Sequence, residues 1–310
     1  MKNYYIMEEI VKKYPSLHRI YREIPLNKRK WYIEQVSKTE KINFVNEMNL
    51  KSVSYEDFFK NKKVAIIGPS PSIYNEENGD FIEENYDIIV RINKQWKHDP
   101  SLDKYIGKRT DVIYNCLDYS EECGGTMDTE YLKNNNVKMI VDPIQYLYDN
   151  KKQRDFFMFS GTYRLNMYTY FHLNNKNKIP FGMIHPTKYW VWDKYADTRI
   201  NTGLLAIIDI LHCDIKELYV KGFTFFKDGY VKDYRSSIHD VTFTEDESAK
   251  HVIKRLAQGR NHDQKKQWKF FKILLQHEAM CKKIKMDQAL ESIMNLETFD
   301  SDYNFRPHVH

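Results

Sequence analysis

The sequence predicts an α/β fold with a mostly parallel sheet and helices on both faces. From residue 62 onward, short β-branched runs bounded by Gly, Asp, Asn or Pro alternate with stretches of helical or loop character. The runs are "VAIIG", "YDIIVRIN", "TDVIYNC", "VKMIVD" and "ELYVKGF". The first is almost continuously apolar, which is typical of a strand buried on both faces. This alternation favours a Rossmann-like arrangement, in which ligands bind at the carboxyl ends of the strands.

Two longer segments have the apolar periodicity of helices. The first is "NTGLLAIIDILHC", with Thr202 near its start and His212 near its end. The second begins near Asn261 or His262 and carries lysines toward its end. Its apolar residues follow the 3.6-residue helical period at Trp268, Phe271, Leu274 and Leu275.

Residues 1–57 are predicted to form a helical N-terminal extension, and residues 58–310 the main domain. Apolar residues at helical spacing stand among many Lys, Arg and Glu in the extension. One interpretation is an amphipathic cap on the main domain. The other is a basic arm, "LHRIYREIPLNKRKWY", whose cations and aromatics would suit a phosphate backbone with bases to stack on.

Composition indicates a globular chain and leaves its partner open. With 310 residues, 42% of them hydrophobic, the chain can bury a sizeable core. The formal net charge of +5 is compatible with a nucleotide, a nucleic acid or a membrane surface, and is too small to choose among them. The four cysteines form no C-x-x-C pair and no dense framework, so we expect reduced thiols and no structural zinc. No apolar run approaches the roughly 20 residues of a membrane span.

The loop after the first predicted strand has the position of a phosphate-binding loop but few of its glycines. In "KKVAIIGPSPSIY" only Gly68 remains of a G-x-G-x-x-G fingerprint, and the G-K-[ST] of a Walker loop is missing. Ser70 and Ser72 still offer hydroxyl and N–H groups to an anion. The alternative is a strand connection without a ligand.

Three further segments could face the same cleft. Arg91 and Asn93 end the second strand, where they could present a cation and an amide to a ligand in the cleft. The alternative is that Arg91 is a surface arginine and Asn93 a turn asparagine. Thr202 and Gly203 open a helix and could donate hydrogen bonds to a phosphate. Gly222 ends the last predicted strand, and Phe223, Phe226 and Tyr230 follow it as a possible slot for a nucleobase.

Together and in this order, these segments resemble the sialyltransferase-type glycosyltransferases of families 29 and 42. "KKVAIIGPSPSI", "YDIIVRIN" and "IGKRTDVIYN" are similar to the long sialyl motif, "NTGLLAIIDILHCDIKELYVKGFTFFKDG" to the short motif, and "HDQKKQ" to the final H-x-x-x-x-E motif. The resemblance covers about residues 62–270. It implies a sialyltransferase-like fold and a nucleotide-sugar co-substrate, with no other cofactor and no metal.

The resemblance also implies roles for particular residues. Ser72 and Asn93 would bind the ribose or phosphate of the donor. Gly222 and Phe223 would lie against its base. His262 would be the general base for an inverting transfer, since an imidazole can take the proton of an acceptor hydroxyl. The candidate donor-binding residues are Gly68, Ser70, Ser72, Arg91, Asn93, Thr202, Gly203, Gly222, Phe223, Tyr230 and Tyr234.

The sequence departs from the family pattern in several places. Pro69 replaces the loop asparagine, which removes one expected hydrogen bond to the donor, and Gln267 replaces the acid of the last motif. The chain has neither the membrane anchor nor the cysteine pair of animal members, so it resembles soluble microbial or viral ones. We therefore expect a cytoplasmic enzyme, in the host cytoplasm if the source is a phage or a virus. His239, followed by Asp240, is the alternative base.

Three functional hypotheses follow. The first is an inverting glycosyltransferase with a CMP- or UDP-linked donor, by family default of sialyl or Kdo type, acting on a glycan. The second is a phage-type enzyme that adds a neutral sugar such as a pentose to a hydroxylated base in DNA, which would have to be flipped out of the duplex. The third is a nucleotide-binding module without catalysis.

Overall fold

A computed structural model describes residues 55–97, 99–117, 126–143, 170–231 and 262–299. Contacts divide the chain into two units, residues 1–52 with 146–177 and residues 53–145 with 178–310. Of the first unit only residues 170–177 are described, and they begin with a short helical stretch. The fold below is that of the second unit. The predicted N-terminal extension lies almost entirely outside the described residues and stays a prediction.

The core of the second unit is a parallel sheet of seven strands in the order β5-β4-β3-β2-β1-β6-β7. The strands are β1 (Lys63–Ile67), β2 (Ile88–Ile92), β3 (Val112–Tyr114), β4 (Met139–Asp142), β5 (Phe181–Met183), β6 (Glu217–Lys221) and β7 (Ile284–Met286). The five strands predicted from the sequence are confirmed as β1 to β4 and β6. The two edge strands, β5 and β7, were not predicted.

The chain order places a topological switch point between β1 and β6. From β1 the chain moves outward through β2, β3 and β4 to β5, and then returns to pair β6 with the other side of β1. Ile67 at the end of β1 is paired with Arg91 on β2 and with Lys221 on β6. In parallel sheets, ligands bind outside the carboxyl ends of the strands at such a point.

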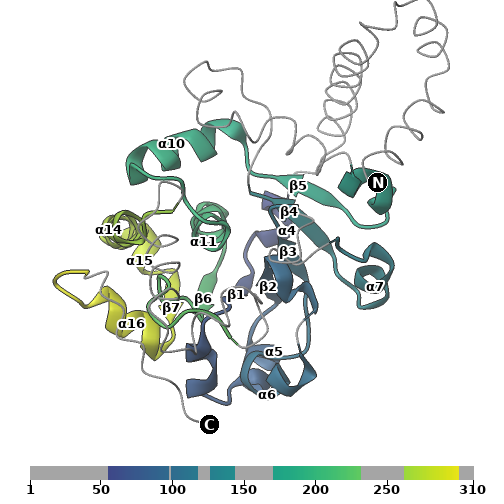
Figure 1. Ribbon diagram of the computed structural model, residues 1–310, viewed down its shortest axis with the longest axis horizontal. Helices are drawn as coiled ribbons and strands as arrows, with labels where there is room; N and C mark the ends of the chain where they lie inside the picture. Colours follow the sequence, from purple (N-terminus) through teal and green to yellow (C-terminus); the bar gives the residue numbers. More distant parts are fainter. Residues whose placement is uncertain (1–54, 98, 118–125, 144–169, 232–261, 300–310) are drawn as a thin grey trace, which may run out of the picture. The chain divides into compact units, whose positions relative to one another are not determined.

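Helices cover both faces of this sheet (Figure 1). The α-helices are α4 (Glu56–Phe59), α5 (Gly79–Asn85), α6 (Asp103–Ile106), α7 (Thr129–Asn134), α10 (Pro186–Ala196), α11 (Thr202–His212), α14 (Gln264–Leu275), α15 (Glu278–Cys281) and α16 (Gln288–Met294). The short 3₁₀ helices are η1 (Pro71–Asn75), η2 (Asn93–Lys97) and η3 (Pro100–Leu102). The two predicted long helices are confirmed as α11 and α14. The predicted domain boundary after residue 57 falls inside α4.

Alternate residues of β1 belong to two different apolar clusters, one on each face of the sheet. Val64 and Ile66 of β1 face the cluster formed with α10, α11, α14 and α16, whereas Ala65 and Ile67 face the cluster formed with α5 and α6. This two-sided burial follows from the near-continuous apolar character of β1. In the part of the chain that the structure describes, no helix has both the length and the apolar character to span a membrane.

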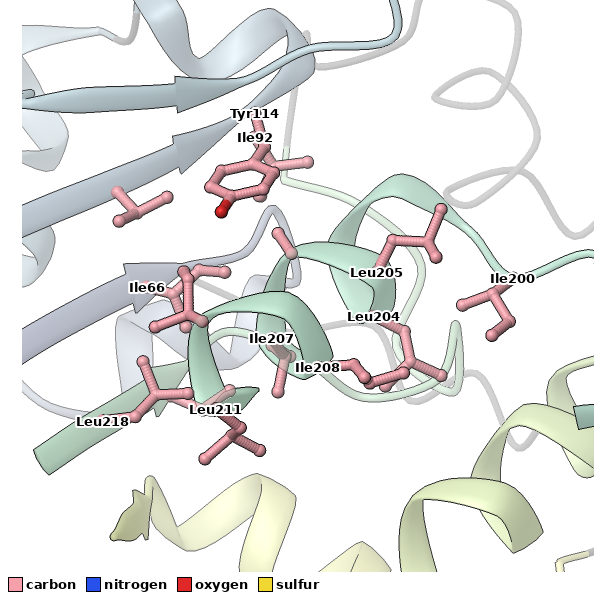
Figure 2. Packing of buried hydrophobic residues seen from close by; sticks show 14 of the residues in the cluster. Ile66, Ile92, Tyr114, Ile200, Leu204, Leu205, Ile207, Ile208, Leu211 and Leu218 are labelled. Atoms are coloured by element: carbon pink, nitrogen blue, oxygen red, sulfur yellow. The ribbon is translucent and has the colours of Figure 1, made fainter. Parts of the chain in front are cut away.

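Helix α11 is the most completely buried of the described helices. Its residues from Thr202 to Leu211 are all buried, as is expected of a helix that is apolar around its circumference. Figure 2 shows Leu204, Ile207 and Leu211 on α11, with Ile66 of β1 and Leu218 of β6 nearby in the same cluster. Full burial of each such side chain contributes on the order of 1.5–3 kcal/mol.

One carboxylate interrupts this apolar helix. Asp209 is fully buried, and its Oδ2 accepts hydrogen bonds from the hydroxyl groups of Tyr55, at 2.6 Å, and Tyr114, at 2.8 Å. Burial raises the pKa of Asp209 to about 6, although both hydroxyl donors favour the charged form. The carboxylate therefore ties α11 to β3 and to the residue before α4.

Asp209 makes stability depend on pH. Because the pKa of Asp209 is about 6 in the folded chain and about 3.9 when unfolded, the native state binds more protons in that window. The contribution of Asp209 to the free energy of unfolding should therefore fall by on the order of 1–3 kcal/mol as pH rises from about 4 to about 6, and Asp209→Asn should remove that fall. Urea denaturation across the window measures it, with the exposed Asp87→Asn as the control. Equal pH slopes for wild type and Asp209→Asn would contradict this assignment.

Candidate functional site

The loops after β1 and β6 are joined by backbone hydrogen bonds at the switch point. The Gly68 N–H donates to the Lys221 carbonyl at 2.7 Å, and the Ser70 N–H donates to the Gly222 carbonyl at 3.0 Å. On the other side, the buried side chain of Gln95 in η2 donates from Nε2 to the Gly68 carbonyl at 2.9 Å. The predicted donor loop is therefore held from both neighbouring strands.

Glycine is required at both positions where these loops meet. A Cβ on Gly68 would lie 2.2 Å from the Gly222 carbonyl oxygen, and a Cβ on Gly222 would lie 2.6 Å from the Gly68 carbonyl oxygen. Gly222 also has a φ of +76°, which favours glycine. Its N–H donates to Oδ2 of Asp287 at 2.8 Å, and Asp287 in turn caps α16.

The ring of Phe223 lies between the end of β1 and the start of α11. A Cβ on Gly68 would come within 2.8 Å of this ring, and a Cβ on Gly203 within 2.6 Å of it. The structure therefore brings together three residues that the sequence analysis proposed separately. Phe223 is half-buried, so part of the ring remains accessible.

The two serines of the loop after β1 differ in their contacts. The Ser70 hydroxyl oxygen accepts from the Ser72 N–H and from the Thr224 hydroxyl, each at 3.2 Å, so Ser70 holds the loop together. The Ser72 hydroxyl is buried and has no hydrogen-bond partner among the residues that the structure describes. Such a group costs free energy unless something pairs with it, which makes Ser72 the better candidate for a ligand contact.

Arg91 supports a loop beside the site. Its guanidinium is fully buried and donates to the carbonyls of Ile106, at 3.0 Å, and Gly107, at 2.6 Å. Burial lowers the pKa of Arg91 to about 10. Its Nη2 fixes the segment between α6 and β3, whereas Nη1 is buried and has no hydrogen-bond partner among the described residues. The expected contact of Arg91 with a donor stays a prediction.

Asn93 joins the carboxyl ends of β2 and β3. Its φ is +45°, an uncommon backbone conformation that asparagine tolerates better than most residues. Its Oδ1 accepts from the Cys116 N–H at 3.1 Å, which leaves the amide nitrogen of the half-buried side chain as a donor.

The start of α11 is capped by Asn201, whose Oδ1 accepts from the Leu204 N–H at 2.9 Å. Thr202 and Gly203 occupy the first turn, where helix N–H groups carry partial positive charge. This turn contacts the Phe223 ring through Gly203, as described above. It is therefore positioned to receive an anionic group close to the carboxyl ends of β1 and β6.

His262 lies directly before α14 and contacts the segment that leads into α11. Its Nδ1 is 3.0 Å from the Arg199 carbonyl oxygen. Because a carbonyl can only accept, Nδ1 carries the proton, and in the neutral ring Nε2 carries the lone pair. This is the tautomer that a general base acting through Nε2 needs.

The remaining predicted residues have other locations. Tyr230 is buried in the cluster on the α5 side of the sheet, with its ring centroid 5.1 Å from that of Phe226. Tyr234 and His239 lie outside the described residues. Among the residues that are described, no group of three or more His, Cys, Asp and Glu could hold a metal ion.

The sequence analysis missed three residues that shape the site: Gln95, Asn201 and Asp287. Asn201 and Asp287 each precede an apolar periodic segment, which is a recognisable capping signal. Gln95 carried no such signal, because its contact with Gly68 depends on how the two loops meet in space.

No protein-family model matches this sequence, and no curated protein matches it. Solved structures that are similar to the chain include three sialyltransferases. A mammalian sialyltransferase in complex with Gal-beta-1-3GalNAc-ortho-nitrophenol is 14% identical, with a TM-score of 0.48 over 85% of this chain and 86% of that one. CstII from Campylobacter jejuni, in complex with cytidine-5'-monophosphate, is 16% identical, with a TM-score of 0.42 over 79% and 92%. Cst-I from Campylobacter jejuni is 14% identical, with a TM-score of 0.44 over 84% and 90%.

The close contact of the two loops can be tested with Gly222→Ala. The new Cβ would meet the backbone oxygen of Gly68, so we expect a loss of stability larger than the roughly 1–3 kcal/mol of backbone strain alone. Gly107→Ala is the matched control, because Gly107 has a φ of +73° but its Cβ would meet only the flexible Glu83 side chain. Urea denaturation compares the two. Equal losses would contradict the claim that the approach of the loops makes glycine necessary.

Proposed function

We propose that this chain is a glycosyltransferase that moves a sugar from a nucleotide-activated donor to an acceptor hydroxyl with inversion. The observation that carries the proposal is that the short segment from Arg199 to Asn201 both accepts the hydrogen bond of His262 Nδ1 and caps the first turn of α11. A base and an anion-binding helix start are what such a transfer requires, and both are attached to the same short segment.

In this proposal the donor binds across the switch point. The helix start at Thr202 and Gly203 receives the phosphate, and the unpartnered Ser72 hydroxyl and the Asn93 amide pair with the phosphate or ribose. The half-buried Phe223 ring, with Gly222, lies against the base. Support for these contacts comes from Gly203, Gly222 and Phe223, which lie around Gly68 where β1 and β6 end and α11 begins.

The chemical step follows from the tautomer of His262. Nε2 takes the proton of the acceptor hydroxyl as the oxygen attacks the anomeric carbon of the sugar. The bond from that carbon to the phosphate oxygen breaks, and the nucleotide leaves with the electron pair. The N–H groups of the first turn of α11 stabilise the charge that develops on the leaving phosphate. Attack and departure on opposite faces give inversion.

The donor in the proposal is a CMP- or UDP-linked sugar, and the default is sialyl or Kdo transfer to a glycan. The motifs quoted from the sequence support this choice. The alternative of a base in DNA drew on the altered donor loop and on the basic arm at residues 17–32, and this arm lies outside the described residues. We therefore put forward the glycan acceptor.

The assignment of Ser72 as a donor contact can be tested by thermal shift with CMP and UDP. Because the Ser72 hydroxyl has no partner, Ser72→Ala should leave the ligand-free melting temperature unchanged or slightly raised, and should reduce the stabilisation by nucleotide. Ser70→Ala is the control, since it removes an acceptor of two hydrogen bonds and should lower the ligand-free melting temperature. An undiminished nucleotide shift in Ser72→Ala would sink the assignment.

The role of His262 can be tested with His262→Asn. Asparagine keeps an N–H donor that can reach the Arg199 carbonyl but has no equivalent of Nε2, so CMP stabilisation should persist while transfer falls by about 10²–10⁴-fold. The assay follows CMP release from CMP-N-acetylneuraminate with a galactoside acceptor. Unchanged transfer would exclude His262 as the base. Nucleotide binding without any transfer by the wild type would favour the non-catalytic module.

A further inference from the structure

Gln267 makes an unusual buried contact on α14. Its side chain is fully buried, and Oε1 accepts a hydrogen bond from the backbone N–H of Asn201 at 3.0 Å. Since a backbone N–H can only donate, this contact fixes which end of the amide faces the segment. The Nε2 of Gln267 is buried and has no hydrogen-bond partner in the described part of the chain. The Oε1 atom of this amide therefore forms a hydrogen bond, while its Nε2 atom remains unsatisfied.

The partner of Gln267 belongs to the four-residue segment 198–201, which follows Asp197 after α10 and leads into α11. Three of its residues are bound by the start of α14. The Asp263 N–H donates to the Thr198 hydroxyl at 3.1 Å, His262 Nδ1 donates to the Arg199 carbonyl at 3.0 Å, and Asn201 donates to Gln267. The remaining residue, Ile200, donates its N–H to Oδ1 of Asp193 on α10 at 3.0 Å. Every residue of the segment is therefore held by a hydrogen bond.

The same segment serves both halves of the proposed site. The Arg199 carbonyl sets the tautomer of His262, and two residues later the Asn201 side chain caps the first turn of α11. A shift of the segment would therefore change the base and the helix start together. Gln267 holds the segment at the residue that joins it to α11.

We propose that Gln267 is a positioning residue that couples the tautomer of His262 to the start of α11, an inference that rests on the proposed function for its catalytic meaning. Gln267 contacts neither donor nor acceptor in this proposal. It acts by supplying one fixed hydrogen-bond acceptor to the Asn201 N–H. A neutral amide does this without placing a charge in a fully buried position.

Three variants separate this role from ordinary stability. Gln267→Met keeps the length of the side chain and removes the acceptor. Gln267→Glu keeps an acceptor oxygen but buries an ionisable group, so it should lower the melting temperature. Trp268→Phe is the matched control on the same helix, because it removes the hydrogen bond from Nε1 to the Ile293 carbonyl and leaves the segment untouched.

The readout is the ring ¹⁵N spectrum of His262 in the full chain labelled with ¹⁵N-histidine. The spectrum is recorded at pH about 8.5, where a histidine with an ordinary pKa is neutral. His262→Asn identifies the signal by its loss. Wild type should show one Nδ1–H tautomer.

Gln267→Met should lose the single-tautomer signature, and Gln267→Glu should restore it despite a lower melting temperature. Trp268→Phe should keep it. A single Nδ1–H tautomer in Gln267→Met, with stability reduced as in Trp268→Phe, would overturn the proposal. Loss of the signature in Gln267→Glu as well would also overturn it, because the acceptor would then not be the cause.

This test is independent of the proposed function. The tautomer is read without substrate, so an absence of transfer in the wild type would remove the catalytic interpretation and leave the positioning result intact. If transfer is found, Gln267→Met should lower kcat while Trp268→Phe keeps it. An unchanged kcat in Gln267→Met would show that the tautomer is not needed for the reaction.

Discussion

The close approach of Gly68 and Gly222 is the constraint on which the site depends. Two hydrogen bonds join the loops after β1 and β6, and the backbones lie so near that either Cβ would clash with the other residue's carbonyl. This contact joins the two loops at the switch point, and the Phe223 ring lies beside it, between β1 and α11. Gln95 and Asp287 then fix the two glycines from either side.

Much of the sheet could be predicted because its central strands are continuous apolar runs. β1 and β2 are buried on both faces, so their sequences carry little polar interruption. The edge strands could not be predicted in the same way. β5 and β7 each have three residues, and β7 is partly exposed, so neither leaves a long periodic pattern.

The sequence allowed several residues of the candidate site to be predicted, but not the directions of their side chains or the contacts between them. Gly68, Gly203 and Phe223 were proposed on local signals, and the structure places them in contact. The direction of Arg91 could not be read from its place at the end of β2, because that strand is buried on both faces and its neighbours decide where the side chain goes. Gln267 was noted only as a departure from a motif; its bond to Asn201 joins positions far apart in the sequence.

The central claim is that a nucleotide binds at the carboxyl ends of β1 and β6, beside the start of α11. Backbone amide spectra of the ¹⁵N-labelled chain, recorded during titration with CMP, test it most directly. We expect the largest saturable shifts at Gly68, Ser72, Gly203 and Phe223. Saturable shifts confined to residues away from these loops, such as those of α7 and β5, would contradict the account.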